Sequence, residues 1–133
     1  MIETSARVLS RVLTGSTYLL LGYDAFASPG ARVGLAGPTL AAMRRVLPLP
    51  DDDELVVRAN GAVQAVAGAA LVAGVAPRTA ALALVGSMVP TTVAGHAFWK
   101  VEDPAARKTQ QVQFVKNLAM VGGLIAIASR RRS

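Results

Sequence analysis

The side chains best suited to chemistry lie between residues 90 and 123. This stretch holds the only histidine of the chain, His96, the only tryptophan, Trp99, and the adjacent pair Lys116 and Asn117. An imidazole, an ammonium group and a carboxamide can each donate a hydrogen bond to the carbonyl oxygen of a small ligand. These residues are therefore candidates for binding a small ligand.

Redox and metal chemistry within the chain is limited by what the composition lacks. The sequence has no cysteine and one histidine. Without cysteine there are no disulfides, no thiolate ligands and no thiol redox chemistry. One histidine cannot supply both axial ligands of a bis-histidine haem, and it lacks the usual partners of a zinc site. We expect no catalytic residues, no metal site and no enzymatic cofactor of the chain's own, although a bound quinone is compatible with the sequence.

The composition indicates a membrane protein. The 133 residues predict a single domain, of which 53% are hydrophobic and 17% charged, against about 25% charged in a typical soluble domain. The charged residues gather between apolar segments instead of recurring at every turn, as they do on soluble helices. Each segment approaches the ~20 residues that a membrane span needs. We predict an all-α bundle of four transmembrane helices at residues 6–27, 55–76, 79–99 and 112–129.

Small residues predict how the segments pack. Gly15 and Gly22 share a stripe of the first segment, and the second segment carries Gly61, Gly68 and Gly74. Such stripes allow two membrane helices to approach closely. The short turn at Pro77-Arg78 makes the second and third segments antiparallel neighbours.

The connection at residues 28–53 is rich in proline and glycine. Within it, residues 38–47 could form a short helix at the membrane interface, because a proline precedes two arginines that suit lipid headgroups. The acidic run at residues 51–54 has the position of an N-terminal cap for the second segment. It lacks the ligand spacing of a calcium site.

The basic residues lie at the segment ends, which is typical of membrane proteins, and the net charge is +6. We expect lipid, not nucleic acid, as their partner, because few aromatic residues interleave with them. An even number of spans places both termini on one side. The total Lys/Arg count on each side does not decide the orientation, but Arg7, Arg11 and the run Arg130–Arg132 favour cytoplasmic termini.

The predicted orientation of the four spans places many polar side chains at one depth in the outer half of the bundle. We predict that Arg58, His96, Lys116 and Asn117 form one cluster, with Asp24 as its acidic partner. Charged groups in a span cost about 2.5–3.5 kcal/mol each on insertion scales, so they usually pair or face the bundle. Thr92 and Trp99 complete the candidate ligand-binding residues, although Trp99 also suits an interfacial anchor.

Two interpretations of this predicted cluster stay open. The charged and polar side chains could be structural ion pairs and side chains that reach toward the interface. Alternatively, they could line an outward-facing pocket for a small ligand, a quinone headgroup or the loop of a partner protein.

Several short elements resemble the DoxX family of small bacterial membrane proteins. The similarity excludes residues 28–53 and rests on Arg11, Gly15, Gly22, Arg58, Gly61, Gly68, Gly74, Pro90-Thr91, His96-Ala97-Phe98-Trp99, Asp103-Pro104, the sequence FVKNLA at 114–119 and Gly122-Gly123. The resemblance implies a four-helix protein of the bacterial inner membrane. Relatives are linked to thiosulfate–quinone oxidoreduction and to membrane complexes with superoxide dismutase and a sulfurtransferase. No agreed catalytic residues can be carried over.

Three functions are compatible with these observations. The first is a small subunit or scaffold of a membrane oxidoreductase or oxidative-stress complex, with membrane or periplasmic proteins as partners. The second is a quinone- or small-ligand-binding protein. The third, a transporter, is the weakest because the chain shows no inverted repeat, although a homo-oligomer could supply one. Copurification from native membranes separates the first from the others.

Overall fold

The computed structural model describes residues 1–131, and every regular element in that range is helical. The prediction of an all-α fold is confirmed. In chain order the elements are α1 (Ile2–Ala27), α2 (Arg32–Met43), α3 (Asp53–Ala73), α4 (Pro77–Gly95), the 3-10 turn η1 (Phe98–Lys100) and α5 (Pro104–Ser129).

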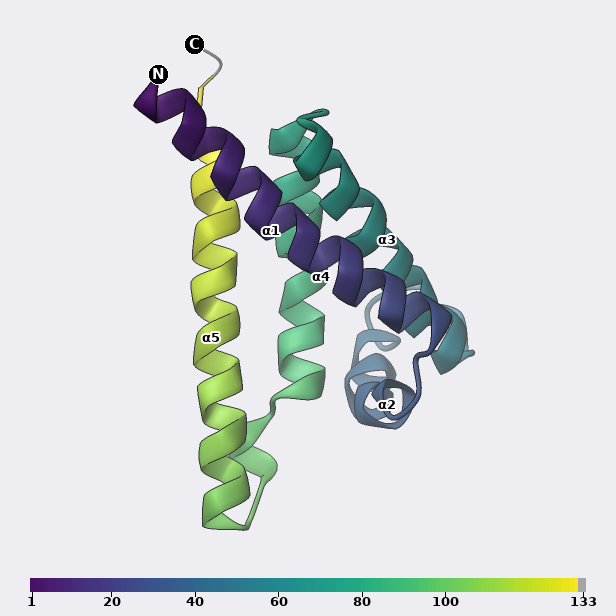
Figure 1. Cartoon of the computed structure of the whole chain (residues 1–133). Helices are drawn as coiled ribbons and strands as arrows, with labels where there is room; N and C mark the ends of the chain where they lie inside the picture. Colours follow the sequence, from purple (N-terminus) through teal and green to yellow (C-terminus); the bar gives the residue numbers. More distant parts are fainter. Residues whose placement is uncertain (132–133) are drawn as a thin grey trace.

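The long helices run alternately up and down, so that both ends of the described chain lie at the same end of the molecule (Figure 1). Helix α1 packs along α3, α3 packs on α4, and α4 packs on α5. Helix α2 lies at the opposite end, against α3 and α4. Helix α5 has extensive contact only with α4 and is therefore an edge of the bundle.

Three of the described helical segments are long and apolar enough to cross a membrane. They are Asp53–Ala73, Pro77–Lys100 and Pro104–Ser129. The fourth predicted span, in α1, is not confirmed, because α1 is not among the segments that are both long enough and apolar enough. Helix α1 is long enough, but Arg11, Asp24 and the hydroxyl and glycine residues between them lower its mean hydropathy.

Glycines set the close pairing of α1 with α3. Gly15 lies opposite Gly68 and Gly22 opposite Gly61, and the two glycines on each helix are seven residues, about two turns, apart. A Cβ atom at Gly15 would lie 2.5 Å from the carbonyl oxygen of Gly68, which is closer than real Cβ contacts. The predicted close approach of these stripes is confirmed.

The ends of α3 follow local rules. The Asp52 carboxylate accepts a hydrogen bond from the backbone N–H of Leu55 at 3.1 Å, as an N-cap does. Gly74 ends the helix in the left-handed region with a φ of 72°, a conformation that glycine adopts without a steric penalty. The predicted acidic cap is confirmed, while the C-terminal end comes at Ala73 instead of residue 76.

Other helix ends also differ from the predicted bounds, most of all the start of α5. Helix α5 begins at Pro104 instead of residue 112, so it includes most of the charged stretch that was predicted to be a loop. The Asp103 side chain caps this start, because it accepts a hydrogen bond from the backbone N–H of Ala106 at 2.8 Å. Helix α4 ends at Gly95 instead of residue 99, and Trp99 belongs to η1.

The short helix in the connection is also displaced from its prediction. It was expected at residues 38–47 with Pro38 near its start, but α2 spans Arg32–Met43 and Pro38 lies inside it. A proline ring within a helix crowds the residue four positions earlier. That residue is Gly34, so α2 lacks the hydrogen bond to the Gly34 carbonyl that an N–H at position 38 would make.

The interior divides along the bundle axis. Toward the chain termini the core is apolar and includes Tyr18, Leu71, Leu84 and Leu124, each almost completely buried. Toward α2 the contacts between α3, α4 and α5 include buried Gln64, Ser87, Thr92 and Asn117. The polar half is where the candidate site lies.

Candidate functional site

A ladder of polar side chains joins α3 to α4. Gln64 Nε2 donates to Ser87 Oγ at 2.9 Å, Ser87 Oγ donates to Asn60 Oδ1 at 2.7 Å, and Asn60 Nδ2 donates to Thr91 Oγ1 at 3.0 Å. Thr91 in turn donates to the backbone carbonyl of Ser87 at 2.8 Å. Each hydroxyl therefore both donates and accepts, so this ladder is occupied by contacts within the protein.

A second set of polar contacts joins α4 to α5. Asn117 Nδ2 donates to Thr92 Oγ1 at 3.1 Å, with both side chains buried. The His96 Nδ1 lies 2.8 Å from Gln110 Oε1, and it donates there because an amide oxygen accepts. Asn117, Thr92 and His96 thus lie along one helix–helix contact, as their shared predicted depth suggested.

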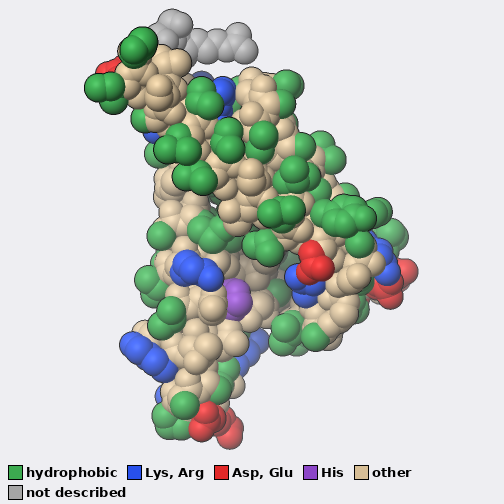
Figure 2. Space-filling view, in the orientation of Figure 1, with side chains coloured by type: hydrophobic (Ala, Val, Ile, Leu, Met, Phe, Trp, Pro, Cys, Tyr) green, Lys and Arg blue, Asp and Glu red, His purple; other side chains and the backbone are tan. Residues whose placement is uncertain are grey.

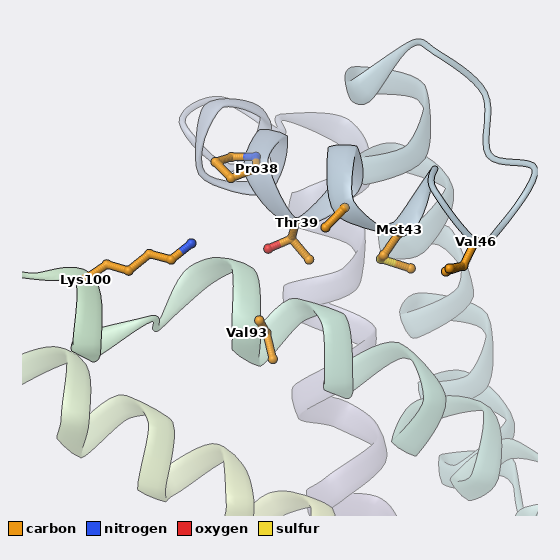
Figure 3. Close-up of a pocket in the computed structure, with 7 residues that line it drawn as sticks. Pro38, Thr39, Met43, Val46, Val93 and Lys100 are labelled. Carbon is orange, nitrogen blue, oxygen red and sulfur yellow. The ribbon is translucent and has the colours of Figure 1, made fainter.

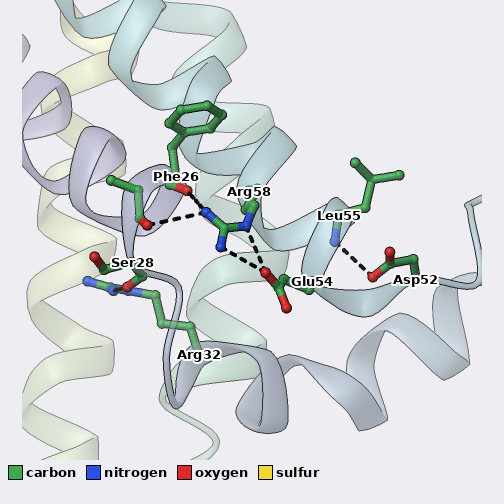
Figure 4. Close-up of polar contacts among 8 residues, drawn as sticks. Phe26, Ser28, Arg32, Asp52, Glu54, Leu55 and Arg58 are labelled. Carbon is green, nitrogen blue, oxygen red and sulfur yellow. Dashed lines mark hydrogen bonds and ion pairs between the residues drawn. The ribbon is translucent and has the colours of Figure 1, made fainter.

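Arg58 does not join these residues. Its Nη1 donates to the backbone carbonyls of Phe26 and Ala27, which are unsatisfied acceptors at the end of α1. Its Nη2 lies 2.8 Å from Glu54 Oε1 within the same helix. Figure 4 shows the guanidinium between the end of α1 and Glu54. Arg58 therefore caps α1, and its predicted place in one cluster with His96 is wrong.

The predicted acidic partner is also wrong. Asp24 Oδ2 lies 2.7 Å from Arg32 Nη2, in a pair whose side chains are about half exposed. Lys116 is exposed on the surface of α5, while its neighbour Asn117 is buried. Consecutive helical residues point in directions about 100° apart, so adjacent residues at the same depth face different surroundings. The five side chains consequently do not form a single cluster.

Trp99 is part of an aromatic group at the turn between α4 and α5. Its ring lies 5.3 Å from that of Phe98 and 5.8 Å from that of Phe114, in edge-to-face geometry. Such pairs contribute about 0.5–1.5 kcal/mol beyond their area burial. The Trp99 side chain remains 51% exposed, so it fastens η1 to α5 and still presents a face to its surroundings.

The location of Asp24 gives a testable expectation. We expect the destabilisation of Asp24→Ala and that of Lys116→Met to add in the double variant, because the two residues have no partner in common. Asp24→Ala combined with Arg32→Ala should instead show a coupling of about 0.2–1 kcal/mol, as exposed ion pairs do. Reversible unfolding in mixed micelles measures both cycles. A coupling of more than about 0.5 kcal/mol between Asp24 and Lys116 would contradict the observed pairing.

A cavity of about 340 Å³ lies between α2, the end of α4 and η1. Its lining is mostly apolar, with Met43, Val46 and Val93 on its walls and Thr39 and Lys100 as polar groups. Figure 3 shows the Lys100 ammonium and the Thr39 hydroxyl turned toward the same space. Its volume lies at the lower end of the range of small-ligand sites, although it is open to its surroundings instead of enclosed.

The sequence prediction missed this cavity. Thr39 and Met43 lie in α2, which the hydrophobic pattern marks only as an interfacial segment, and Lys100 lies in a charged stretch. The sequence did contain the two features that form it, a short interfacial helix and a basic residue just after a span. That pattern does not show that the two segments meet.

A comparison with models of known protein families identifies the family of the chain. A sequence model of the DoxX family matches residues 6–97, which is more than half of the 133 residues. The chain belongs to the DoxX family. The predicted resemblance is confirmed, but its extent differs from the prediction. The match includes residues 28–53, which the prediction excluded, and it stops before Phe98-Trp99, Asp103-Pro104 and the motifs in α5 that also suggested the family. The chain matches no curated protein and no solved structure.

Membership of the DoxX family and three apolar helices make this a multi-pass membrane protein that contacts lipid. Figure 2 shows hydrophobic side chains spread over much of the face in view, with most of the charged side chains in its lower half. Among the exposed apolar side chains are Leu9, Leu20, Val66 and Val89 from three different helices. Lipid tails can cover this surface, whereas water could not do so without a large penalty.

Proposed function

We propose that this DoxX-family protein is a small integral subunit of a membrane oxidoreductase or oxidative-stress complex in the bacterial inner membrane, with both termini cytoplasmic. In this role it positions other proteins and has no catalytic activity of its own. The observation that carries the proposal is the outer face of α5, the edge helix.

Helix α5 offers a face suited to another membrane helix. A Cβ atom built at Gly122 or Gly123 would meet nothing within 4 Å, whereas one built at any of the four glycines between α1 and α3 would collide with backbone. Val115, Leu118 and Ile125 on the same helix are each more than half exposed. Small residues that permit close approach promote helix association in membranes, so α5 is the surface expected to receive a partner.

The polar side chains support a positioning role. Thr92, His96 and Asn117 use hydrogen-bonding groups within the bundle, and Arg58 uses its guanidinium to cap α1. Side chains held in this way fix the relative positions of the helices. A bundle whose helices are fixed in this way, with an exposed face on its edge helix α5, suits a scaffold subunit.

The cytoplasmic orientation of the termini is proposed from charge. Arg7, Arg11, Arg78, Arg130 and Arg131 gather at the end where the chain begins and ends. Basic residues next to spans are retained on the cytoplasmic side. Arg132, which also contributed to the prediction, lies outside the described residues.

Quinone binding is the second candidate function, and the cavity between α2 and α4 favours it. The Lys100 ammonium or the Thr39 hydroxyl could donate to a quinone carbonyl, while Met43, Val46 and Val93 would contact the ring. His96 and Asn117 are weaker candidates for this contact than the sequence suggested, since they are hydrogen-bonded within the bundle.

Purification from native membranes in mild detergent tests both functions. We expect redox-enzyme subunits to copurify with the wild type. Gly122→Leu, on the helix face that also carries Val115, Leu118 and Ile125, should lower their yield by about tenfold, which corresponds to a loss of about 1.4 kcal/mol of association energy. Gly86→Leu is the matched control, because Gly86 is also an exposed helical glycine with open space but lies on α4. Mass spectrometry identifies the proteins and lipids retained.

Three outcomes separate the hypotheses. Equal retention of partners by Gly122→Leu and the wild type would show that this face of α5 is not the docking face. Copurification of proteins with no redox function would refute the oxidoreductase assignment. Stoichiometric quinone in a sample without partner proteins would favour the second function.

A further inference from the structure

A larger cavity, of about 700 Å³, lies at the other end of the molecule. It is formed where the first turns of α1, the turn between α3 and α4, and the end of α5 come together, at the end that holds both chain termini (Figure 1). The charged residues that line it are all arginines, namely Arg7, Arg11, Arg78, Arg130 and Arg131. Three segments distant in the sequence thus direct positive charge into one space.

Most of this charge is not neutralised within the protein. Arg7 pairs with Glu3 across 3.7 Å. Arg11, Arg78 and Arg130 make no side-chain hydrogen bond or ion pair with any residue in the described range 1–131. Gathering like charges without counter-ions is unfavourable, so an anion from outside the protein would relieve the repulsion.

Arg11 is positioned by its surroundings. Its Nε is buried and has no hydrogen-bond partner among the described residues. Its guanidinium lies against Gly74, where a Cβ atom would come within 2.9 Å of Nη1. The glycine that ends α3 therefore leaves the space in which this guanidinium rests, at the wall of the cavity.

The start of α4 adds uncharged donors to the same space. Its N-cap residue, Ala76, provides no side-chain cap, and Pro77 occupies the first turn. The backbone N–H groups of Arg78 and Thr79 therefore have no partner within the helix. Uncapped N–H groups at a helix N-terminus carry partial positive charge and favour anions. Here they border a cavity that already contains guanidinium groups.

We propose that this cavity binds a phosphate group, carried either by the headgroup of an anionic phospholipid or by a soluble phosphorylated molecule. Guanidinium groups match phosphate oxygens with paired hydrogen bonds, and backbone N–H groups can take the remaining oxygen. Scattered arginines that only face lipid headgroups would not need to converge on one cavity. The proposal does not depend on the α5 docking face, which lies on a different surface.

Thermal unfolding in neutral detergent tests the proposal with two probes. Phosphatidylglycerol is titrated against phosphatidylcholine, and inorganic phosphate is titrated against chloride at the same ionic strength. We expect at least one of the two phosphate probes to raise the Tm of the wild type. The double variant Arg11→Gln/Arg78→Gln should bind that probe about tenfold or more weakly, as expected for lost hydrogen bonds between charged groups.

The matched control is Arg45→Gln/Lys108→Gln, which removes the same charge from exposed residues that do not line this cavity. It should respond as the wild type does. The single variant Arg78→Gln provides a second measurement, because Arg78 is exposed and its loss leaves the Arg11–Gly74 contact intact. We expect it to bind several-fold more weakly, since one charged hydrogen-bonding group is lost.

The outcomes identify the source of the phosphate or overturn the site. A response to phosphatidylglycerol alone assigns the cavity to a lipid headgroup, and a response to inorganic phosphate that the cavity variants lose assigns it to a soluble ligand. No response to either probe overturns the proposal. Equal weakening in the cavity variants and the control also overturns it, because binding would then depend only on net charge.

Discussion

Gly68→Leu is expected to disrupt the pairing of α1 with α3 and to destabilise the protein by about 3 kcal/mol or more. Overpacking a well-packed interior usually costs about 1–3 kcal/mol. Here a Cβ atom alone would lie 2.5 Å from the backbone nitrogen of Leu19 and 2.6 Å from the carbonyl oxygen of Gly15. Backbone atoms cannot rotate away as a side chain can, so the two helices would have to separate.

The measurement is reversible unfolding in mixed micelles, with the yield of monodisperse protein as a second readout. Gly86→Ala serves as the control, because Gly86 is in α4 with nothing within 4 Å of a Cβ atom. Alanine has a higher helix propensity than glycine, so this control should be neutral or up to about 1 kcal/mol more stable. If Gly68→Leu were as stable as the control, the observed packing of α1 on α3 would be incorrect.

Ser87→Ala is expected to destabilise the protein by about 2 kcal/mol. The Ser87 hydroxyl is 7% exposed, accepts from Gln64 and donates to Asn60. Interhelical hydrogen bonds in membranes contribute about 0.6 kcal/mol on average and up to about 1.7 kcal/mol. Removing the hydroxyl breaks both of these bonds. It leaves the buried amide donor of Gln64 and the partly buried carbonyl acceptor of Asn60 without partners, which adds a desolvation penalty.

Ser129→Ala is the matched control for this substitution. The Ser129 hydroxyl is exposed and bonds only to the carbonyl of Ala126 in its own helix, so its loss should change stability by less than about 0.5 kcal/mol. A further variant, Ser87→Ala with Gln64→Leu, removes the unpaired donor and should recover part of the lost stability. Equal stabilities for Ser87→Ala and Ser129→Ala would show that the ladder contributes nothing.

The sequence by itself determined the features that depend on short-range pattern. Apolar segments predicted the helical class, and the match to the DoxX family agrees with the resemblance read from short motifs. The spacing of Gly15 with Gly22 and of Gly61 with Gly68 predicted two close-packing stripes, since residues seven apart return to the same helix face. The acidic cap of α3 was also predictable, because a cap involves neighbouring residues only.

The tertiary structure alone decided which polar groups meet. Depth along a helix can be read from residue number, but the neighbour that a side chain faces depends on how the helices are rotated. Lys116 is exposed and Asn117 is buried for this reason. The partners of Arg58 are backbone carbonyls, which every residue carries and no sequence pattern marks.

The partner of Asp24 could not be predicted for the same reason. It is Arg32, which lies in the connection after α1, where no periodic pattern indicates which way a side chain faces. The two cavities could not be predicted from the sequence either, because each forms between segments that are distant in the chain. The sequence assigned Arg7, Arg11 and Arg78 to one side of the membrane, but only the packing of α1, α4 and α5 brings them to one space. Likewise, Lys100 and α2 line the same space because α2 packs on α4, and local pattern cannot encode a contact between segments far apart in the sequence.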